Sequence, residues 1–420
     1  MLVVALIGAT SGARAQGTIV VAPNGPVRTI AAAIRLARPG ARIVVTAGTY
    51  REPTIVVDRP VEIVGRGWPV LDGEGQRAIM TVTADHVTIR GLAFRDVGPS
   101  FTQDRAAIRV QEASDCAITD NRIERGFFGI YLARVSGCRI ERNDLSAAGA
   151  TETTSGNGIH LWTVDHVTIA DNHVRGYRDG IYFEFVHQGD VARNVSEGNL
   201  RYGLHFMFSD DCRYADNRFD HNGSGVAVMY TRHVTMTDNR FEQNWGGAAY
   251  GLLLKEISDV RLERNRFRRN TVGLVADGTT RLTALDNEFV DNGWAVKLDA
   301  NAQEGRFTGN SFVGNSFDVS TNGRNTETTF DGNFWDAYEG YDLDHDGRGD
   351  VPHRPVRLFS ILVERNEPAL ILLRSPFVSL LDGAERVIPA LTPETLSDQR
   401  PLMRRPASRL TTAQPPRSAP

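Results

Sequence analysis

The chain has 420 residues, of which 41% are hydrophobic and 23% are charged, and its formal net charge is −4. This composition is typical of a globular protein with enough apolar residues for a large core. No basic patch dominates the sequence, which excludes nucleic acid as the main partner.

The N-terminus predicts export. In MLVVALIGATSGARAQG an apolar run from Leu2 to Ile7 precedes Ala13-Arg14-Ala15, an A-x-A cleavage signature ahead of Gln16. The stretch is short and lacks a basic residue before the apolar run, so a strand-forming N-terminus is the alternative. We expect residues 1–15 to be the signal peptide of a periplasmic protein. No later stretch reaches the ~18–20 apolar residues that span a bilayer.

Residues 28–52 predict a cap on the fold. The sequence RTIAAAIRLARPGARIVVTAGTYRE indicates a short amphipathic helix, a stop at Gly40, a strand and a turn. A helix over the first coil of a sheet would cover an edge that otherwise invites aggregation.

One motif recurs from about residue 85 to residue 335, with the form V-x-I-x-x-N-x-F-x-x-N-x-x-G-I-x-L. Most intervals between copies are 22 or 23 residues, and the insertions SAAGATETTSGN and WGGAAYG lengthen the others. A fixed period of this size indicates a solenoid. The anchoring asparagines are Asn121, Asn143, Asn172, Asn194, Asn217, Asn239, Asn265, Asn287, Asn310 and Asn333.

Two solenoid classes have such a period. Leucine-rich repeats share the L-x-L-x-x-N element, but the second half of their repeat needs a helix or another convex segment. Here the second half is G-I-x-L, whose alternation after a glycine turn is typical of a strand. We therefore predict an all-β fold, a right-handed parallel β-helix over residues 16–335. Its asparagines stack structurally, and its interior holds Phe219, Phe241, Phe267, Phe289 and Phe312.

The three cysteines, Cys116, Cys138 and Cys212, take positions that valines hold in other coils, so we interpret them as small core residues. An odd number without a CxxC motif implies no disulfide scaffold. Cys116 and Cys138 fall on successive coils, ~4.8 Å apart. A bridge between them is sterically possible, but we do not predict one.

The G-I-x-L strands define an outward strip. Their inward residues are all apolar, so the alternate residues must point outward. Imidazole and thioether groups together suit copper(I), while methionines and aromatics also form docking patches. Plain apolar surface under a loop is the third interpretation. The candidate residues for partner binding or copper are His160, Trp162, Tyr182, Glu184, His205, Met207 and Met229.

Further along the strip, Asp277 and Asp299 share a column on adjacent coils. Their spacing could approach the ~5–5.5 Å of a retaining glycosidase pair, so a β-helix enzyme acting on polysaccharides is the alternative function. Lys255 and Lys297 are neighbours, and a solvated salt ladder is the commoner outcome. Nucleophile motifs, a P-loop and zinc-ligand spacings are absent. We predict no catalytic residues and no enzyme activity.

Residues 336–356 form an aspartate-rich loop. In YDLDHDGRGD, Gly347 stands at position 6 of an EF-hand-type loop, but position 12 is His353 in place of glutamate and no helix pattern flanks the loop. A full EF-hand is excluded. We expect a calcium-pinned turn, with a polar turn whose carboxylates accept backbone N–H groups as the alternative. The candidate ligands are Asp342, Asp344, Asp346 and Asp350.

Residues 357–396 predict amphipathic helices. Their longest apolar run, Pro368–Leu381, contains Arg374 and is too short to span a membrane. The helices could sit on a membrane protein, and they could also cap the last coil. From 397 to 420 the chain is rich in Pro, Arg and Ser, which predicts a disordered tail.

Four segments carry a family resemblance: NRFEQNWGGAAYGLLLKEISDVRLERNRF, NGWAVKLDAN, NFWDAYEGYDLDHDGRGDVPHRPV and ALILLRSPFVSLLDGAERVIP. They resemble the NosD family of periplasmic nitrous oxide reductase maturation proteins, and the similarity extends to about residue 405. The resemblance implies a non-enzymatic accessory role in assembling the copper–sulfur centre of nitrous oxide reductase. The implied partners are the ATPase and permease of an ABC transporter, a copper chaperone lipoprotein and the reductase.

The resemblance also implies that the C-terminal helices join the permease, which would associate the protein with the membrane. The family's metal ligands form no fixed short motif that could be carried over. The outward strip is therefore an inference from this sequence alone.

Overall fold

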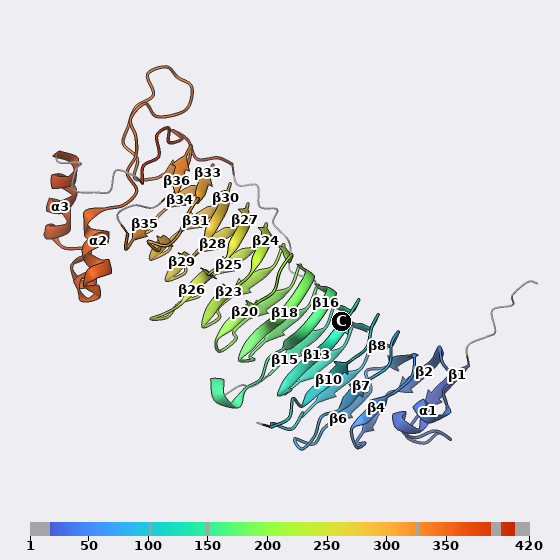
Figure 1. Cartoon of the computed structure of the whole chain (residues 1–420). Helices are drawn as coiled ribbons and strands as arrows, with labels where there is room; N and C mark the ends of the chain where they lie inside the picture. The colour runs from blue at the N-terminus through green and yellow to red at the C-terminus, as the bar shows by residue number, and fades with distance from the viewer. Residues whose placement is uncertain (1–16, 101, 148–150, 324–326, 388–395, 408–420) are drawn as a thin grey trace, which may run out of the picture.

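The computed structural model describes residues 17–100, 102–147, 151–323, 327–387 and 396–407. The predicted signal peptide lies outside them. The described strands wind into a parallel β-helix, as predicted (Figure 1). The helix α1 (Ile30–Leu36) covers one end, while α2 (Leu358–Arg365) and α3 (Pro376–Val387) lie at the other, joined by the 3-10 helix η2 (Glu367–Leu372). A further 3-10 turn, η1, spans Glu152–Thr154.

The strands form two parallel sheets. The larger sheet contains β1 (Thr18–Val21), β2 (Ala41–Thr46), β4 (Ile55–Val57), β5 (Val61–Arg66), β7 (Met80–Val82), β8 (Thr88–Arg90), β10 (Ala106–Gln111), β11 (Ala117–Thr119), β13 (Phe128–Ser136), β14 (Arg139–Glu141), β16 (Ile159–Ala170), β18 (Asp179–Ala192), β20 (Tyr202–Met207), β21 (Arg213–Ala215), β23 (Ser224–Met229), β24 (Arg232–Thr237), β26 (Tyr250–Lys255), β27 (Ser258–Glu263), β29 (Val272–Asp277), β30 (Thr280–Leu285), β32 (Trp294–Leu298), β33 (Arg306–Thr308), β35 (Phe317–Thr321) and β36 (Thr329–Asp331). The smaller sheet contains β3 (Thr49–Tyr50), β6 (Val70–Asp72), β9 (Ala93–Arg95), β12 (Arg122–Glu124), β15 (Asp144–Ser146), β17 (His173–Arg175), β19 (Val195–Glu197), β22 (Arg218–Asp220), β25 (Arg240–Glu242), β28 (Arg266–Arg268), β31 (Glu288–Val290), β34 (Ser311–Val313) and β37 (Phe334–Trp335).

Aromatic rings stack through the interior of the later coils. The predicted phenylalanines are buried, and each ring lies nearly parallel to the next, for example with 4.7 Å between the centroids of Phe241 and Phe267. Trp335 ends the stack, 4.1 Å from Phe312. Because a solenoid coil contacts only its neighbours, this repeated contact fixes the register from coil to coil.

The predicted asparagine ladder is present, and it is fully hydrogen-bonded. In each step the side-chain oxygen of one asparagine accepts two N–H groups of the asparagine on the preceding coil. Asn143 Oδ1, for example, accepts from Asn121 N at 3.1 Å and from Asn121 Nδ2 at 3.0 Å. A second ladder, which we did not predict, is formed by Asn199, Asn222, Asn244, Asn270, Asn292 and Asn315.

The N-terminal cap forms much as predicted. Thr29 Oγ1 caps α1 by accepting from Ala32 N at 3.2 Å, and the carboxylate of Glu52 accepts from Ile30 N at 2.7 Å. Ile30 and Ile34 are buried against the first coil. The helix ends at Leu36, four residues before the predicted stop at Gly40.

The cysteines differ from our expectation. Cys116 and Cys138 directly precede β11 and β14 on successive coils; both are buried, and they are joined by a disulfide with 4.5 Å between their Cα atoms. Stacking of β11 on β14 brings their side chains together, and a buried pair at this separation can be bridged without backbone movement. Cys212 is buried and free.

The prediction of a disordered tail is wrong for residues 397–407, because these residues are placed against the last coil. Asp398 is fully buried, and its carboxylate accepts from Gly332 N at 2.9 Å, Asn333 N at 2.8 Å and Trp335 Nε1 at 3.1 Å. This carboxylate supplies the last acceptor of the asparagine ladder. Residues 408–420, also predicted to be disordered, lie outside the described residues.

The helices pack on the last coils. Phe359 and Val363 of α2 and Val378 of α3 are buried against Phe317 of β35. The helix pair therefore caps the fold, as one of our two interpretations expected. No helix among the described residues is both long and apolar enough to cross a membrane.

We predict that Asp398→Ala destabilises the C-terminal coil by about 3 kcal/mol, because it leaves several buried N–H donors without an acceptor. Amide hydrogen exchange at β36 and β37 measures this loss locally, which suits a solenoid that need not unfold in one step. The control is Asp331→Ala on the same coil, whose half-exposed carboxylate pairs with Arg400 at 3.4 Å. Equal exchange in both variants would contradict the capping role.

Candidate functional site

The predicted outward strip exists as two columns of side chains on one face of the larger sheet. Strand pairing places the residues of each column side by side on successive coils. One column is Tyr131, His160, Tyr182, His205 and Ala227, and the other is Ala133, Trp162, Glu184, Met207 and Met229.

His160 is the centre of an aromatic stack. Its ring lies 4.5 Å from the centroid of Tyr131 and 4.7 Å from that of Tyr182. Its Nδ1 atom is 2.9 Å from Asn157 Nδ2. Burial, with the Arg178 guanidinium adding to the effect, lowers the pKa of His160 to about 3. The ring is therefore neutral at pH 7, and both of its faces are covered.

The two histidines of the strip cannot bind one ion together. Tyr182 lies between them in the column, so His160 and His205 are two coils apart. That separation is roughly 9.6 Å at ordinary strand spacing, whereas two imidazoles on one ion each need a nitrogen within about 2 Å of it.

His205 is more buried than a strip residue on the surface would be, with 6% of its area exposed. Tyr202 packs against its ring at 4.8 Å and Tyr182 at 5.2 Å. Burial lowers the pKa of His205 to about 4, although the Asp179 carboxylate opposes the shift. Its Nε2 atom is buried without a hydrogen-bond partner among the described residues. A buried polar atom in that state calls for an explanation.

Two methionines share the face of the sheet with this imidazole. Met207 follows His205 by two residues on β20 and so shares its face, and Met229 pairs with Met207 from β23. Both methionines are half-buried. One neutral imidazole and two thioethers form a soft donor set, of the kind that copper(I) prefers.

A buried ion pair, which the sequence did not lead us to, supports the same region. Asp179 is fully buried and accepts from Arg201 at 2.8 Å and 2.5 Å. Its Oδ2 atom lies 4.0 Å from His205 Nδ1. Asp179 directly precedes the glycine of its G-I-x-L element. This place in the repeat is the sequence signal from which its position beside the strip could have been inferred.

The acidic pair further along the strip, Asp277 and Asp299, forms hydrogen bonds and a salt bridge with neighbouring side chains. Asp277 pairs with Lys255 at 3.3 Å and accepts from Asn301 Nδ2 at 3.2 Å. Asp299 accepts from Asn322 Nδ2 at 2.9 Å, and burial raises its pKa, with the neighbouring Asp277 carboxylate adding to the effect. Lys297 turns away to Glu364 at 2.8 Å. Of the salt ladder that we considered the commoner outcome, the pair between Lys255 and Asp277 is present, whereas Lys297 pairs with Glu364 and Asp299 bonds to an asparagine.

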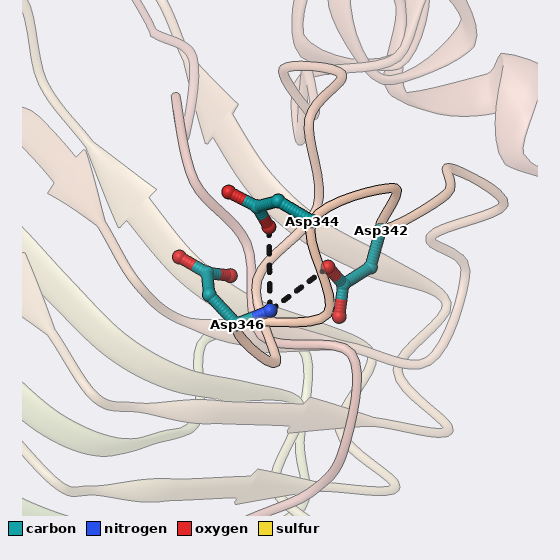
Figure 2. A group of neighbouring side chains, drawn as sticks. All are labelled: Asp342, Asp344 and Asp346. Atoms are coloured by element: carbon teal, nitrogen blue, oxygen red, sulfur yellow. Dashed lines mark hydrogen bonds between the residues drawn. The ribbon is translucent and has the colours of Figure 1, made fainter.

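The aspartate loop brings three of its four predicted ligands together. Asp342, Asp344 and Asp346 offer oxygens within 4.8 Å of one another, and in the described part of the chain no other group of three or more His, Cys, Asp or Glu residues is placed to share an ion in this way. Asp346 N donates to Asp342 Oδ1 at 3.2 Å and to Asp344 Oδ1 at 3.3 Å (Figure 2). Asp350 lies apart from the triad and accepts from Leu343 N at 2.7 Å.

Comparison with known proteins gives a consistent result. Residues 144–340 match the family model described as "Periplasmic copper-binding protein (NosD)". The chain is 30% identical over 389 residues to the "Probable ABC transporter binding protein NosD" of Pseudomonas aeruginosa, with 86% of this chain and 88% of that protein covered. The chain belongs to the NosD family. The protein of the same name from Stutzerimonas stutzeri is 29% identical, with 87% of each chain covered.

The solved structures that resemble this NosD family member support the fold alone. The DFA-IIIase of Arthrobacter chlorophenolicus A6 without its lid matches with a TM-score of 0.50 and 14% identity, covering 77% of this chain and 92% of that one. The family is periplasmic and copper-binding by its description, and the two relatives are named as binding proteins rather than enzymes.

We predict that the stability of this NosD family member falls as the pH drops below about 6.5. The pKa of His160 is depressed in the fold, so the unfolded chain takes up a proton first and about 1.4 kcal/mol is lost per pH unit until the pH nears 3. In His160→Gln the loss in the free energy of unfolding should be smaller by the part that His160 contributes, about 1.4 kcal/mol per pH unit. Urea unfolding at pH 7, 6 and 5 measures it, with the exposed His187→Gln as control. An identical pH slope in wild type and His160→Gln is the contrary result.

Proposed function

We propose that this protein is the periplasmic accessory subunit of an ABC transporter and that it helps to assemble the copper–sulfur centre of nitrous oxide reductase. Membership of the NosD family supports the role, and the names of the two relatives support the association with a transporter. Copper in this proposal is cargo that passes between partners. The proposed partners are the permease and ATPase subunits, a copper chaperone lipoprotein and the reductase itself.

The contact for the copper-carrying partner is the outward strip around His205. The observation that carries this assignment is the buried Nε2 atom of His205, which has no hydrogen-bond partner among the described residues. Met207 lies two residues further along the same strand, and Met229 pairs with Met207 from the next coil. Because the depressed pKa leaves the ring neutral at pH 7, copper would not have to displace a second proton from an imidazolium. Trp162, Tyr182 and Glu184 flank these donors and belong to the same proposed contact.

The C-terminal helices are the proposed contact with the permease. Ile371 is 89% exposed and Leu380 is 73% exposed, although the opposite sides of η2 and α3 pack on the β-helix. Large apolar side chains this exposed on one helical segment support the proposal that another molecule covers it. Through this contact the protein would be associated with the membrane without spanning it.

A polysaccharide-acting enzyme is the second candidate. The fold is compatible with such enzymes, but fold alone does not assign a function. Within the described chain, the two acidic residues that could act are bound to Lys255 and to asparagine side chains. Loss of uronate-polymer turnover in Asp277→Asn would be the sign of this activity.

We predict that the double variant His205→Gln, Met207→Leu lowers copper(I) affinity at least tenfold, because it removes an imidazole and a thioether while keeping side-chain volume. Competition with a chromophoric copper(I) chelator measures the affinity, and the copper content of the reductase in cells reports the function. Thermal melting checks the fold.

The matched control is Leu253→Ala, Lys255→Ala, which lies two coils further along the same two columns at the same spacing. It should leave copper(I) affinity unchanged. Unchanged affinity and unchanged reductase loading in His205→Gln, Met207→Leu would remove the strip from the proposal.

We also propose that calcium fastens the aspartate loop. The three clustered carboxylates support this, while the backbone N–H groups that they accept fit the polar-turn alternative equally. The loop contacts the tail, since Gly349 N donates to Pro401 O at 2.8 Å and Met403 N donates to Gly347 O at 3.0 Å. A cation held in the loop would therefore also steady the tail.

We expect calcium to slow proteolysis of the segment after residue 336, and Asp344→Asn to abolish that protection because it removes a charged ligand. Limited proteolysis with and without a chelator measures it. Asp350→Asn is the comparison, because Asp350 lies outside the triad and should keep the protection. Equal proteolysis in all conditions would contradict calcium binding and would favour the alternative, in which the aspartates only form a polar turn.

A further inference from the structure

A row of exposed aromatic rings borders the strip at the corner that follows it. Phe185, Phe208 and Tyr230 occupy the same corner position on three successive coils, with exposed fractions of 43%, 41% and 45%. Successive ring centroids are 5.3 Å apart, and the planes are 13° and 14° from parallel. Rings stacked in this way cover one another's faces, so that only the two outer rings of the row keep a free face.

The free face of Phe185 borders a groove. On the preceding coil the same corner position is Thr163, which is too small to continue the stack, and on the coil before that it is Arg134. Arg134, Thr163 and Phe185 all line a shallow surface groove of about 560 Å³ that is largely open to solvent. Phe185 and Arg134 are two coils apart, roughly 9.6 Å. A planar group needs about 3.5–4 Å on each side, so the spacing of these coils accommodates one such group on Phe185, while the Arg134 guanidinium itself lies over the Trp162 ring, 5.4 Å from its centroid.

The groove carries an excess of negative charge. Asp85, Glu112 and Asp165 line it together with Arg134. Arg134 is already paired with Glu112, which leaves the carboxylates of Asp85 and Asp165 to act on an incoming group. Asp165 lies diagonally across from Phe185, because its strand neighbour is His187, two residues further on. Its side chain is 54% exposed, and the imidazole Nδ1 atom of His166 lies 3.2 Å from its carboxylate.

A group that stacks on Phe185 and pairs with Asp165 must be both planar and cationic. At pH 7 the arginine guanidinium is the protein side chain that combines these properties permanently, since the lysine ammonium cannot stack, the rings of Phe, Tyr and Trp carry no charge, and an ordinary histidine is mostly neutral. We propose that this groove binds an arginine side chain of a protein partner, with the guanidinium stacked on Phe185 and bonded to the carboxylate of Asp165. This contact involves no copper, so it can be right or wrong independently of the proposed metal transfer.

Three acetylated and amidated tripeptides test the inference: Gly-Arg-Gly, Gly-Lys-Gly and Gly-citrulline-Gly. Lysine keeps the charge without the plane, and citrulline keeps the plane without the charge. Saturation-transfer NMR with the whole protein gives their dissociation constants. We expect the arginine peptide to bind in the millimolar range and about five- to tenfold more tightly than either of the others.

Two substitutions locate the binding. Phe185→Ala should remove the advantage of arginine over lysine, and Asp165→Asn should remove its advantage over citrulline. Tyr230→Ala, at the far end of the aromatic row, is the matched control and should change neither ratio. Equal binding of the three peptides, no saturation transfer at about 20 mM peptide, or an arginine preference that survives both substitutions would each overturn the proposal.

Discussion

The asparagine ladder is the constraint on which the rest of the structure depends. On each coil an asparagine donates hydrogen bonds from a buried backbone N–H and a buried side-chain amide. The acceptor that they share is a side-chain oxygen of the next coil, as Asn121 shows with Asn143. Buried donors without acceptors cost more than such contacts contribute, so a ladder must end on a dedicated acceptor. The first ladder ends on Asp398, and the second passes from Asn315 to Asp318, whose pKa burial raises to about 7. The need for an acceptor thus returns the tail to the last coil.

This return fixes the C-terminal helices at both ends. Before α2, Val356 pairs with Val319 of β35, and after α3 the chain is held again by Asp398 and by Leu402. The exposed apolar residues of η2 and α3 are therefore carried on a segment that is anchored twice to the β-helix. A surface held in this way can meet a partner with less loss of conformational entropy than a free tail would suffer.

Whether the sequence predicts an interaction depends on how far apart in the chain the two interacting residues lie. The interior depends on contacts between equivalent residues one repeat apart, so the period alone predicted the stacked phenylalanines, the asparagines and the outward columns. The contact of Asp398 with Asn333 joins residues 65 positions apart in a segment of polar composition, and no local pattern reveals it. The separation of His160 from His205 could have been obtained by counting coils. The burial of His205 could not, because it depends on Tyr202, which follows a different column.

The repeat constrains the residue types of the interior but not those of the outer face, and the outward residues change in character along the axis. Around His205 the columns hold aromatic rings and sulfur, whereas from Lys255 onward they hold salt bridges, one between adjacent coils and one from Lys297 to Glu364 of α2. Two residues of the His205 column meet Glu364 of α2, namely Lys297 and Ser320. They lie four and five coils from His205, which is roughly 19 and 24 Å along the axis. Every coil in that interval is joined to the next by the ladders and the aromatic stack. Because each coil in this interval is bonded to both of its neighbours, the His205 region and the C-terminal helices belong to one continuous packed stack.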